Sequence, residues 1–156
     1  MTTAAVLALS RPESWNFPLF VHVLGAMILV GGLLTTAGAL AWARGNVPSL
    51  RLGYRTLLAV AFPGWIVMRV GAQWIYNKEG WDDLPDDAQP DWLGIGYLLA
   101  DLGGIILLVS LILGGIGMYR LREGKGAGLL KATMVLSVIL LIAYVIAVWA
   151  MAGKPG

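Results

Sequence analysis

The sequence contains no cysteine and a single histidine, His22, and only 13% of its 156 residues are charged. Without cysteine, neither a thiol–disulfide active site nor a thiolate metal site can form. One histidine cannot supply a conventional zinc or copper site, which needs several nitrogen ligands. Any chemistry in this chain therefore depends on a small number of polar side chains.

Apolar residues dominate the chain and occur in runs long enough to cross a bilayer. They make up 58% of the sequence, and the mean hydropathy is +0.77. A transmembrane helix needs about 20 such residues, and four runs reach that length, at 17–43, 56–76, 93–119 and 129–152. Because lipid offers no partner to free backbone groups, each run must be helical. The sequence predicts an all-α integral membrane protein, a four-transmembrane-helix bundle, with residues 1–156 forming a single membrane domain.

Three positions predict how these helices begin or bend. Asn16, followed by Pro18 in the first turn, is expected to cap the first helix. Asp91 is expected to cap the third helix in the same way. Pro63 and Gly64 lie inside the second run, where the missing backbone donor predicts a kink shortly before Arg69.

The basic residues between the runs predict the orientation. Seven flank one side of the predicted bundle: Arg44, Arg51 and Arg55 in the first connection, and Arg120, Arg122, Lys125 and Lys131 around the third. Three flank the other side: Arg11, Lys78 and Lys154. The positive-inside rule assigns the seven to the cytoplasm. We therefore expect a multi-pass protein of the bacterial cytoplasmic (inner) membrane with both termini outside.

Three ionisable residues, His22, Arg69 and Asp101, lie in three different apolar runs. Such groups are costly in hydrocarbon unless they face one another or a cavity, so each marks a candidate functional site. Once the runs are oriented, all three fall in the outer half of the bilayer, together with Tyr144 of the fourth run. They occupy a layer about 5 Å thick, which is one helical turn.

Arg69 and Asp101 are predicted to form an ion pair, with hydrogen bonds from Gln73, Tyr97 and Tyr144. One interpretation is a structural lock that fixes the register of the bundle. The other is that Arg69 binds an anionic or carbonyl group of a ligand, such as a heme propionate, a quinone or a lipid head group, while Asp101 holds it in place.

His22 has two comparable interpretations. It can be a hydrogen-bonded residue of the bundle, or it can be a ligand of heme iron. A second axial ligand would then come from Met27, Met68 or Met151, from His22 of a second copy, or from no residue at all. A proton relay through His22, Asp101 and Tyr144 is a further hypothesis. Heme b is thus the cofactor that the residues allow, with His22 as its metal ligand and Met68, Arg69 and Met151 as further binding residues.

Glycines recur in the first and third runs, and they allow helices to approach closely in lipid. We therefore expect the first and third helices to pack together, which would bring His22 toward Asp101. The segment from Asn77 to Asp91 is rich in acidic residues, but its spacing does not match an EF-hand. It predicts a solvated acidic loop.

The segment FVHVLGAMILVGGL, from Phe20 to Leu33, places a histidine near the start of the first helix, followed by Gly-Ala and Gly-Gly. It resembles the first helix of small bacterial four-helix membrane proteins of the DUF2269 type. It is more distantly similar to the copper-resistance CopD proteins and to HemJ-type protoporphyrinogen oxidases. The resemblance implies a four-helix bundle over nearly the whole chain and, on the HemJ side, porphyrin handling with His22 as the candidate ligand. The segment departs from the pattern in having Met27 and Ile28 where tryptophan is common, and no second histidine.

These observations favour a small non-enzymatic membrane protein, an accessory or heme-binding component of a membrane redox system. The alternative is a small oligomeric transporter or channel that uses the polar cluster as a proton or ion site. A HemJ-type porphyrin enzyme is the third hypothesis. The expected partners are the lipid bilayer and other membrane subunits or a second copy of the chain, and no nucleic acid.

Overall fold

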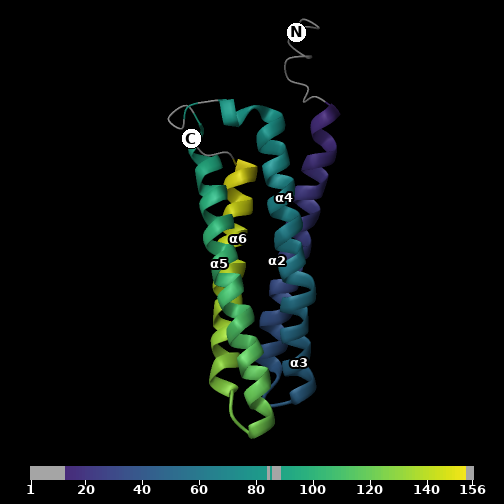
Figure 1. The fold of residues 1–156 in the computed structure, drawn as a ribbon, viewed down its shortest axis with the longest axis vertical. Helices are drawn as coiled ribbons and strands as arrows, with labels where there is room; N and C mark the ends of the chain where they lie inside the picture. Colours follow the sequence, from purple (N-terminus) through teal and green to yellow (C-terminus); the bar gives the residue numbers. More distant parts are fainter. Residues whose placement is uncertain (1–12, 84, 86–88, 154–156) are drawn as a thin grey trace, which may run out of the picture.

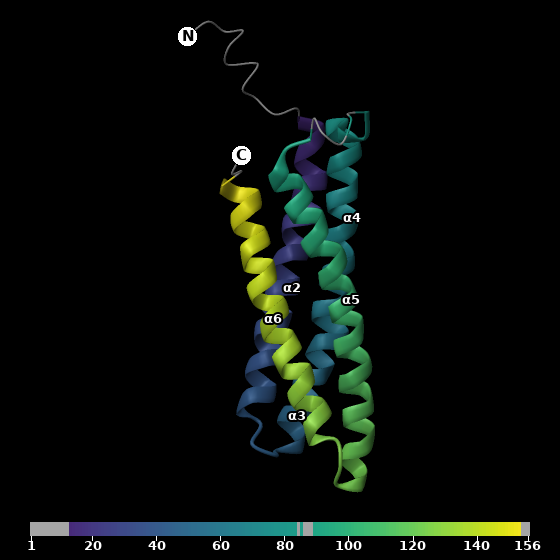
Figure 2. The ribbon, with the colours of Figure 1, turned by 90° about the vertical axis from the view of Figure 1, so that its left-hand side faces the viewer.

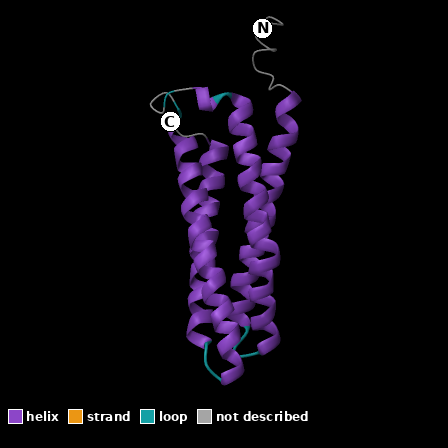
Figure 3. Ribbon diagram, in the orientation of Figure 1, coloured by secondary structure: helices purple, strands orange, loops and turns teal. Residues whose placement is uncertain are grey.

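The computed structural model describes residues 13–83, 85 and 89–153. Arg11 and Lys154, which were counted for the orientation, and Asp86 and Asp87 of the predicted acidic loop lie outside these residues. Throughout the described part of the chain, all regular structure is helical (Figure 3). The elements in order are η1 (Glu13–Trp15), α2 (Asn16–Trp42), α3 (Val47–Thr56), η2 (Leu57–Ala61), α4 (Phe62–Glu79), η3 (Trp81–Asp83), α5 (Asp91–Arg120), η5 (Leu121–Glu123) and α6 (Ala127–Gly153).

Four continuous helical stretches are long and apolar enough to cross a membrane. They are Glu13–Trp42, Val47–Glu79, Asp91–Glu123 and Ala127–Gly153. The predicted all-α architecture with four such helices is therefore confirmed. The helices run alternately up and down, so both ends of the described chain and the α4–α5 connection lie at one end of the bundle (Figures 1 and 2). The α2–α3 and α5–α6 connections lie at the other.

The helices do not pack in the predicted pairs. α2 packs mainly against α4, with further contacts to α3 and α6, and α5 packs mainly against α6. The expected close packing of the first and third long helices, α2 and α5, is wrong. Figure 1 shows α2 beside α4 and α5 beside α6 as two pairs.

Glycines explain why α2 approaches α4 so closely. A Cβ atom at Gly25 of α2 would collide with the backbone of Met68, and one at Gly71 of α4 would lie 2.5 Å from the backbone nitrogen of His22. Gly64 meets the backbone of Leu29 in the same way. Gly25 of α2 and Gly64 and Gly71 of α4 thus allow the close contact between these two helices. The glycines of α5 instead make room for large side chains, such as Trp65 against Gly104.

The core between the helices consists of fully buried leucines. Leu29, Leu33, Leu57, Leu107 and Leu140 have no exposed surface. They come from α2, η2, α5 and α6, so each of the four long helical stretches contributes to the same cluster. Packing of these side chains keeps the spacing of the four stretches along the middle of the bundle.

The second long helix is interrupted where Pro63 predicts a kink. Leu57–Ala61 form a π-helical turn, and the N–H of Phe62 donates to the carbonyl of Leu57, five residues earlier. Pro63 lies in the first turn of α4, where its missing N–H costs least. The interruption therefore takes the form of a π turn just before the proline.

Two expectations about helix starts are wrong. The chain is already helical at η1, so Trp15 rather than Asn16 occupies the N-cap position of α2, with no capping bond from its side chain. At α5, the extended Pro90 occupies the N-cap position, and Asp91 is the first helical residue. Asp91 therefore lies in the first turn, where its negative charge complements the helix dipole.

The first connection is also shorter than predicted. Only residues 43–46 separate α2 from α3, and Arg51 and Arg55 lie on α3 rather than in a loop. One side of α3 buries Leu50 and Gly53, while both arginines are exposed. The amphipathic pattern explains the difference, because one apolar side is enough to hold a short helix against the bundle.

Candidate functional site

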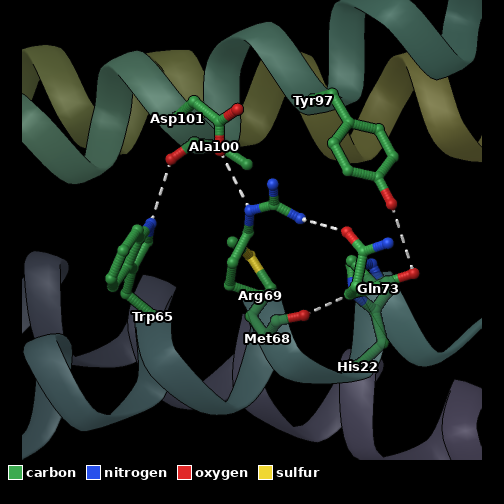
Figure 4. A network of polar contacts seen from close by, with 9 residues as sticks. His22, Trp65, Met68, Arg69, Gln73, Tyr97, Ala100 and Asp101 are labelled. Atoms are coloured by element: carbon green, nitrogen blue, oxygen red, sulfur yellow. Dashed lines mark hydrogen bonds and ion pairs between the residues drawn. The ribbon is translucent and has the colours of Figure 1, made fainter.

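Arg69 of α4 and Asp101 of α5 form the ion pair that the sequence predicts. The Arg69 Nε donates to Asp101 Oδ1 at 2.9 Å, as Figure 4 shows. Arg69 Nη1 donates to Gln73 Oε1 at 3.3 Å, and Gln73 Nε2 donates to Asn77 Oδ1 at 2.9 Å. The four side chains make one continuous polar chain from Asp101 to Asn77.

Two aromatic side chains also bridge α4 and α5. The guanidinium of Arg69 lies 4.7 Å from the centre of the Tyr97 ring, a cation–π contact. The Tyr97 hydroxyl faces the carbonyl of Ala72 at 3.5 Å, and Trp65 Nε1 donates to the carbonyl of Ala100 at 3.0 Å. Sequence reasoning missed the role of Trp65, although its spacing of four from Arg69 places it on the same stripe. Long side chains therefore connect α4 to α5 where the helices are not close-packed.

The cluster is not buried inside the bundle as predicted. The Asp101 side chain is 57% exposed and that of Arg69 is 26% exposed, so the pair lies at the outer edge of the α4–α5 contact. Residues spaced by four share one face of a helix, so Arg69, Gln73 and Asn77 lead along α4 toward its C-terminal end. Eight residues of helix rise about 12 Å. The chain of polar groups thus connects the charged pair with the end of the bundle.

Tyr144 does not join this cluster. Its side chain is only 3% exposed, and its hydroxyl lies against Gly103 of α5. Among the described residues, this hydroxyl makes no hydrogen bond. The predicted hydrogen bond to the ion pair is therefore absent, because Tyr144 faces the core while Asp101 lies at the outer edge of α5.

His22 of α2 faces α4 and does not approach Asp101. Its Nδ1 lies 3.0 Å from the carbonyl oxygen of Met68 (Figure 4). A carbonyl can only accept, so Nδ1 carries the proton and Nε2 of a neutral ring keeps its lone pair. A relay between His22, Asp101 and Tyr144 has no direct contact to support it, because α2 packs against α4 rather than α5.

A cavity of about 610 Å³ lies between the four long helices. Small residues on its walls account for the space, among them Ala26, Ala72, Gly96, Ala100 and Ala147. The polar or sulfur-containing residues on the wall are His22, Met27, Met68, Arg69, Tyr97, Tyr144 and Met151. Six of the eight predicted site residues thus line one apolar cavity, while Gln73 and Asp101 lie outside it.

The three candidate methionines differ in their surroundings. Met27 is 68% exposed, whereas Met68 is 6% exposed. The Met151 side chain packs against Gly96, where an added Cβ atom would collide with its terminal methyl group. Met68 is therefore buried inside the bundle, Met151 is half-buried against α5, and the exposed Met27 lies at the rim of the cavity.

No protein-family model, curated protein or solved structure matches this chain. The resemblance to DUF2269-type, CopD and HemJ-type proteins stays a prediction. Within the described residues, no group of three or more histidine or acidic side chains is placed to hold a metal ion. The fold and site together define a bundle of four potentially membrane-crossing helices, with an apolar cavity next to a polar chain.

Proposed function

We propose that this chain is a small heme-binding membrane protein, an accessory component of a membrane redox system, in which His22 would hold the heme iron. The observation that carries the proposal is the hydrogen bond between His22 Nδ1 and the Met68 carbonyl. Histidines that bind a metal usually donate their other ring N–H to a carbonyl or carboxylate, which fixes the tautomer and orients the ring. His22 has this arrangement, with its Nδ1 held by the Met68 carbonyl.

The cavity supports the same proposal. Its volume of about 610 Å³ lies within the range of small-molecule and cofactor sites, and most of its wall is apolar. Heme sites inside four-helix bundles are built from side chains on facing helices. His22 of α2 and Met151 of α6 both line this cavity. The buried Met68 and the half-buried Met151 are the thioethers that could supply a second ligand. Histidine–methionine ligation raises the potential of a bound heme.

Arg69 gives the cavity one positive charge at its wall. Its Nε is held by Asp101 and its Nη1 by Gln73, so the guanidinium has a fixed direction. Arginine binds carboxylates through paired donors. We assign Arg69 to a propionate of the heme and Asp101 to the positioning of Arg69. When bound, the heme would supply one-electron redox chemistry, and the chain itself holds the cofactor and excludes water from it.

We place the protein in the bacterial inner membrane with both chain ends outside. Seven basic residues lie at the end of the bundle that holds the α2–α3 and α5–α6 connections, or on the helices next to them. The positive-inside rule favours the cytoplasm for that end. The His22–Arg69 region then lies in the outer half of the bilayer.

An absorption spectrum tests the heme proposal. The full-length protein, purified from membranes and supplied with hemin, is expected to show a Soret band that His22→Ala abolishes. Met27→Leu is the matched control and should leave the band unchanged, because Met27 is exposed at the rim. A protein that stays colourless with added hemin, or a band that survives His22→Ala, would overturn the proposal.

A transporter that uses Asp101 as a proton or ion site is the second candidate. The observation that favours it is the polar chain Asp101–Arg69–Gln73–Asn77, which leads toward the outer end of α4. Proton flux into liposomes that Asp101→Asn removes, with Asp83→Asn as the control, would support this function. Equal flux in empty liposomes and in liposomes with the protein would exclude it.

A further inference from the structure

A second cleft of about 620 Å³ lies at the opposite end of the bundle, between α3 and the end of α5. Arg51 and Arg55 of α3 and Arg122 of η5 line it, together with Tyr54 and Tyr119. Arg122 is far from Arg51 and Arg55 in the sequence, and the three arginines come from two elements. The fold therefore gathers three positive charges in one cleft.

The packing of α3 explains how this cleft forms. Tyr54 lies across α5 at Gly114 and Gly115, where added Cβ atoms would lie 2.8 Å and 2.9 Å from its ring and hydroxyl. This contact fixes α3 against α5. Arg51 and Arg55 are one helical turn apart, so they lie on the same face of α3.

In the described part of the chain, none of the three guanidinium groups lies within 4.0 Å of an acidic side chain. Among the described residues, the ion pairs within 4.0 Å consist of Arg69 with Asp101 alone. Three like charges around one cleft repel one another, and an anion between them would relieve the repulsion. The planar donor fork of arginine matches the oxygens of a phosphate group, which lysine contacts only as a point charge.

We propose that this cleft binds the phosphate head group of an anionic phospholipid. The wall also includes apolar side chains, Val47, Met118 and Leu121, next to the arginines. An amphiphile suits such a wall better than free inorganic phosphate does. Basic pockets between membrane helices on the cytoplasmic side are typical sites for anionic head groups. The proposal does not depend on heme, because the cavity next to His22 is lined by a different set of residues.

Lipid retention by the purified full-length chain tests the proposal. Native mass spectrometry would compare phosphatidylglycerol, phosphatidylcholine and inorganic phosphate as probes. The test variant is Arg51→Gln/Arg55→Gln/Arg122→Gln. The control variant, Arg44→Gln/Lys125→Gln/Lys131→Gln, removes the same charge from positions outside the cleft. A thermal melt of each variant checks that it is folded.

We expect the wild type to retain phosphatidylglycerol and not phosphatidylcholine. The cleft variant should bind phosphatidylglycerol at least about tenfold more weakly than the control variant, which is about 1.4 kcal/mol. If the cleft variant is unfolded, Arg122→Gln alone is compared with Lys125→Gln. Equal losses in the two variants would mean general attraction to basic residues and would overturn the proposal, as would binding of inorganic phosphate without binding of the lipid.

Discussion

At the scale of single residues, the ion pair between Arg69 and Asp101 affects stability differently when one partner is replaced and when both are replaced. Asp101 is the only acidic group that contacts Arg69 in the described chain. Removing one partner leaves the other charge uncompensated, whereas removing both leaves two apolar side chains of similar size. Replacing one partner therefore measures the cost of an uncompensated charge, whereas replacing both measures the net contribution of the pair to stability.

We predict that Asp101→Leu lowers the free energy of unfolding by about 1–2 kcal/mol, less than for a fully buried pair because both side chains are partly exposed. The double variant Arg69→Met/Asp101→Leu should recover most of this loss. Thermal unfolding in one detergent measures both, with Asp83→Leu at an exposed position as the control. A double variant as unstable as the single one would contradict the expected coupling.

Tyr144 provides a second prediction at this scale. Its buried hydroxyl makes no hydrogen bond among the described residues. A buried polar group without a partner costs about 1–3 kcal/mol. Tyr144→Phe should therefore unfold at the same temperature as the wild type or a higher one. A lower melting temperature would show that the hydroxyl has a partner, such as a bound ligand or water.

At the scale of helices, glycines determine which pairs can pack. An added Cβ atom at Gly71 meets the backbone of His22, and a backbone cannot move aside as a flexible side chain can. Gly31, on the same helix as His22, has no atom within 4 Å of such a Cβ. The two positions separate the effect of close packing from the helix propensity of glycine.

We predict that Gly71→Ala destabilises the protein by about 1–3 kcal/mol because α2 and α4 must separate. Gly31→Ala should leave the stability unchanged or raise it by up to about 1 kcal/mol, since alanine is the better helix former. Melting temperatures of the two variants, measured in one detergent, test whether Gly71→Ala destabilises the protein more than Gly31→Ala does. A similar loss for both would mean that the α2–α4 contact is not close at Gly71.

The existence of the four long helices and the approximate bounds of three of them could be predicted from the sequence. The extension of the second by α3, and the lateral arrangement of all four, could not. Hydrophobic runs report where a helix crosses lipid, and the depth of Arg69 and Asp101 was enough to predict their pairing. The depth of a residue in the bilayer does not determine in which direction around the helix axis its side chain points. That is why Tyr144, at a similar depth, was wrongly assigned to the same cluster. It is also why the pair was expected to be buried although Asp101 is 57% exposed.

The choice of neighbours was wrong for a related reason. Glycines on the first and third long helices allow a close approach, but they do not specify the partner. The structure uses Gly25 of α2 against Met68 of α4, and Gly103 of α5 against Tyr144 of α6. The cavity next to His22 was missed because it depends on where alanines and glycines from all four helices face one another.

At the scale of the whole molecule, the two ends of the bundle differ in charge. Arg51, Arg55 and Arg122 line a cleft at one end, while Asp83 and Asp91 lie with the chain ends at the other. The proposed orientation rests on the basic residues at the first of these ends, and it would place the two cavities in opposite halves of the bilayer. In that orientation the cavity next to His22 lies in the outer half and the arginine cleft in the cytoplasmic half, where anionic head groups are typically bound.

The absence of cysteine makes the orientation directly testable, because each introduced cysteine is the only thiol in the chain. Asp83→Cys and Ala127→Cys place one exposed thiol at each end of the bundle. We predict that a membrane-impermeant maleimide labels Asp83→Cys in spheroplasts and labels Ala127→Cys only after the membrane is opened. A detergent-treated sample controls for the reactivity of each thiol, and the cysteine-free chain controls for background. Because the positive-inside rule rests on the seven basic residues at the α2–α3 and α5–α6 end, labelling of Ala127→Cys in intact spheroplasts would reverse the orientation. The arginine cleft would then face outward.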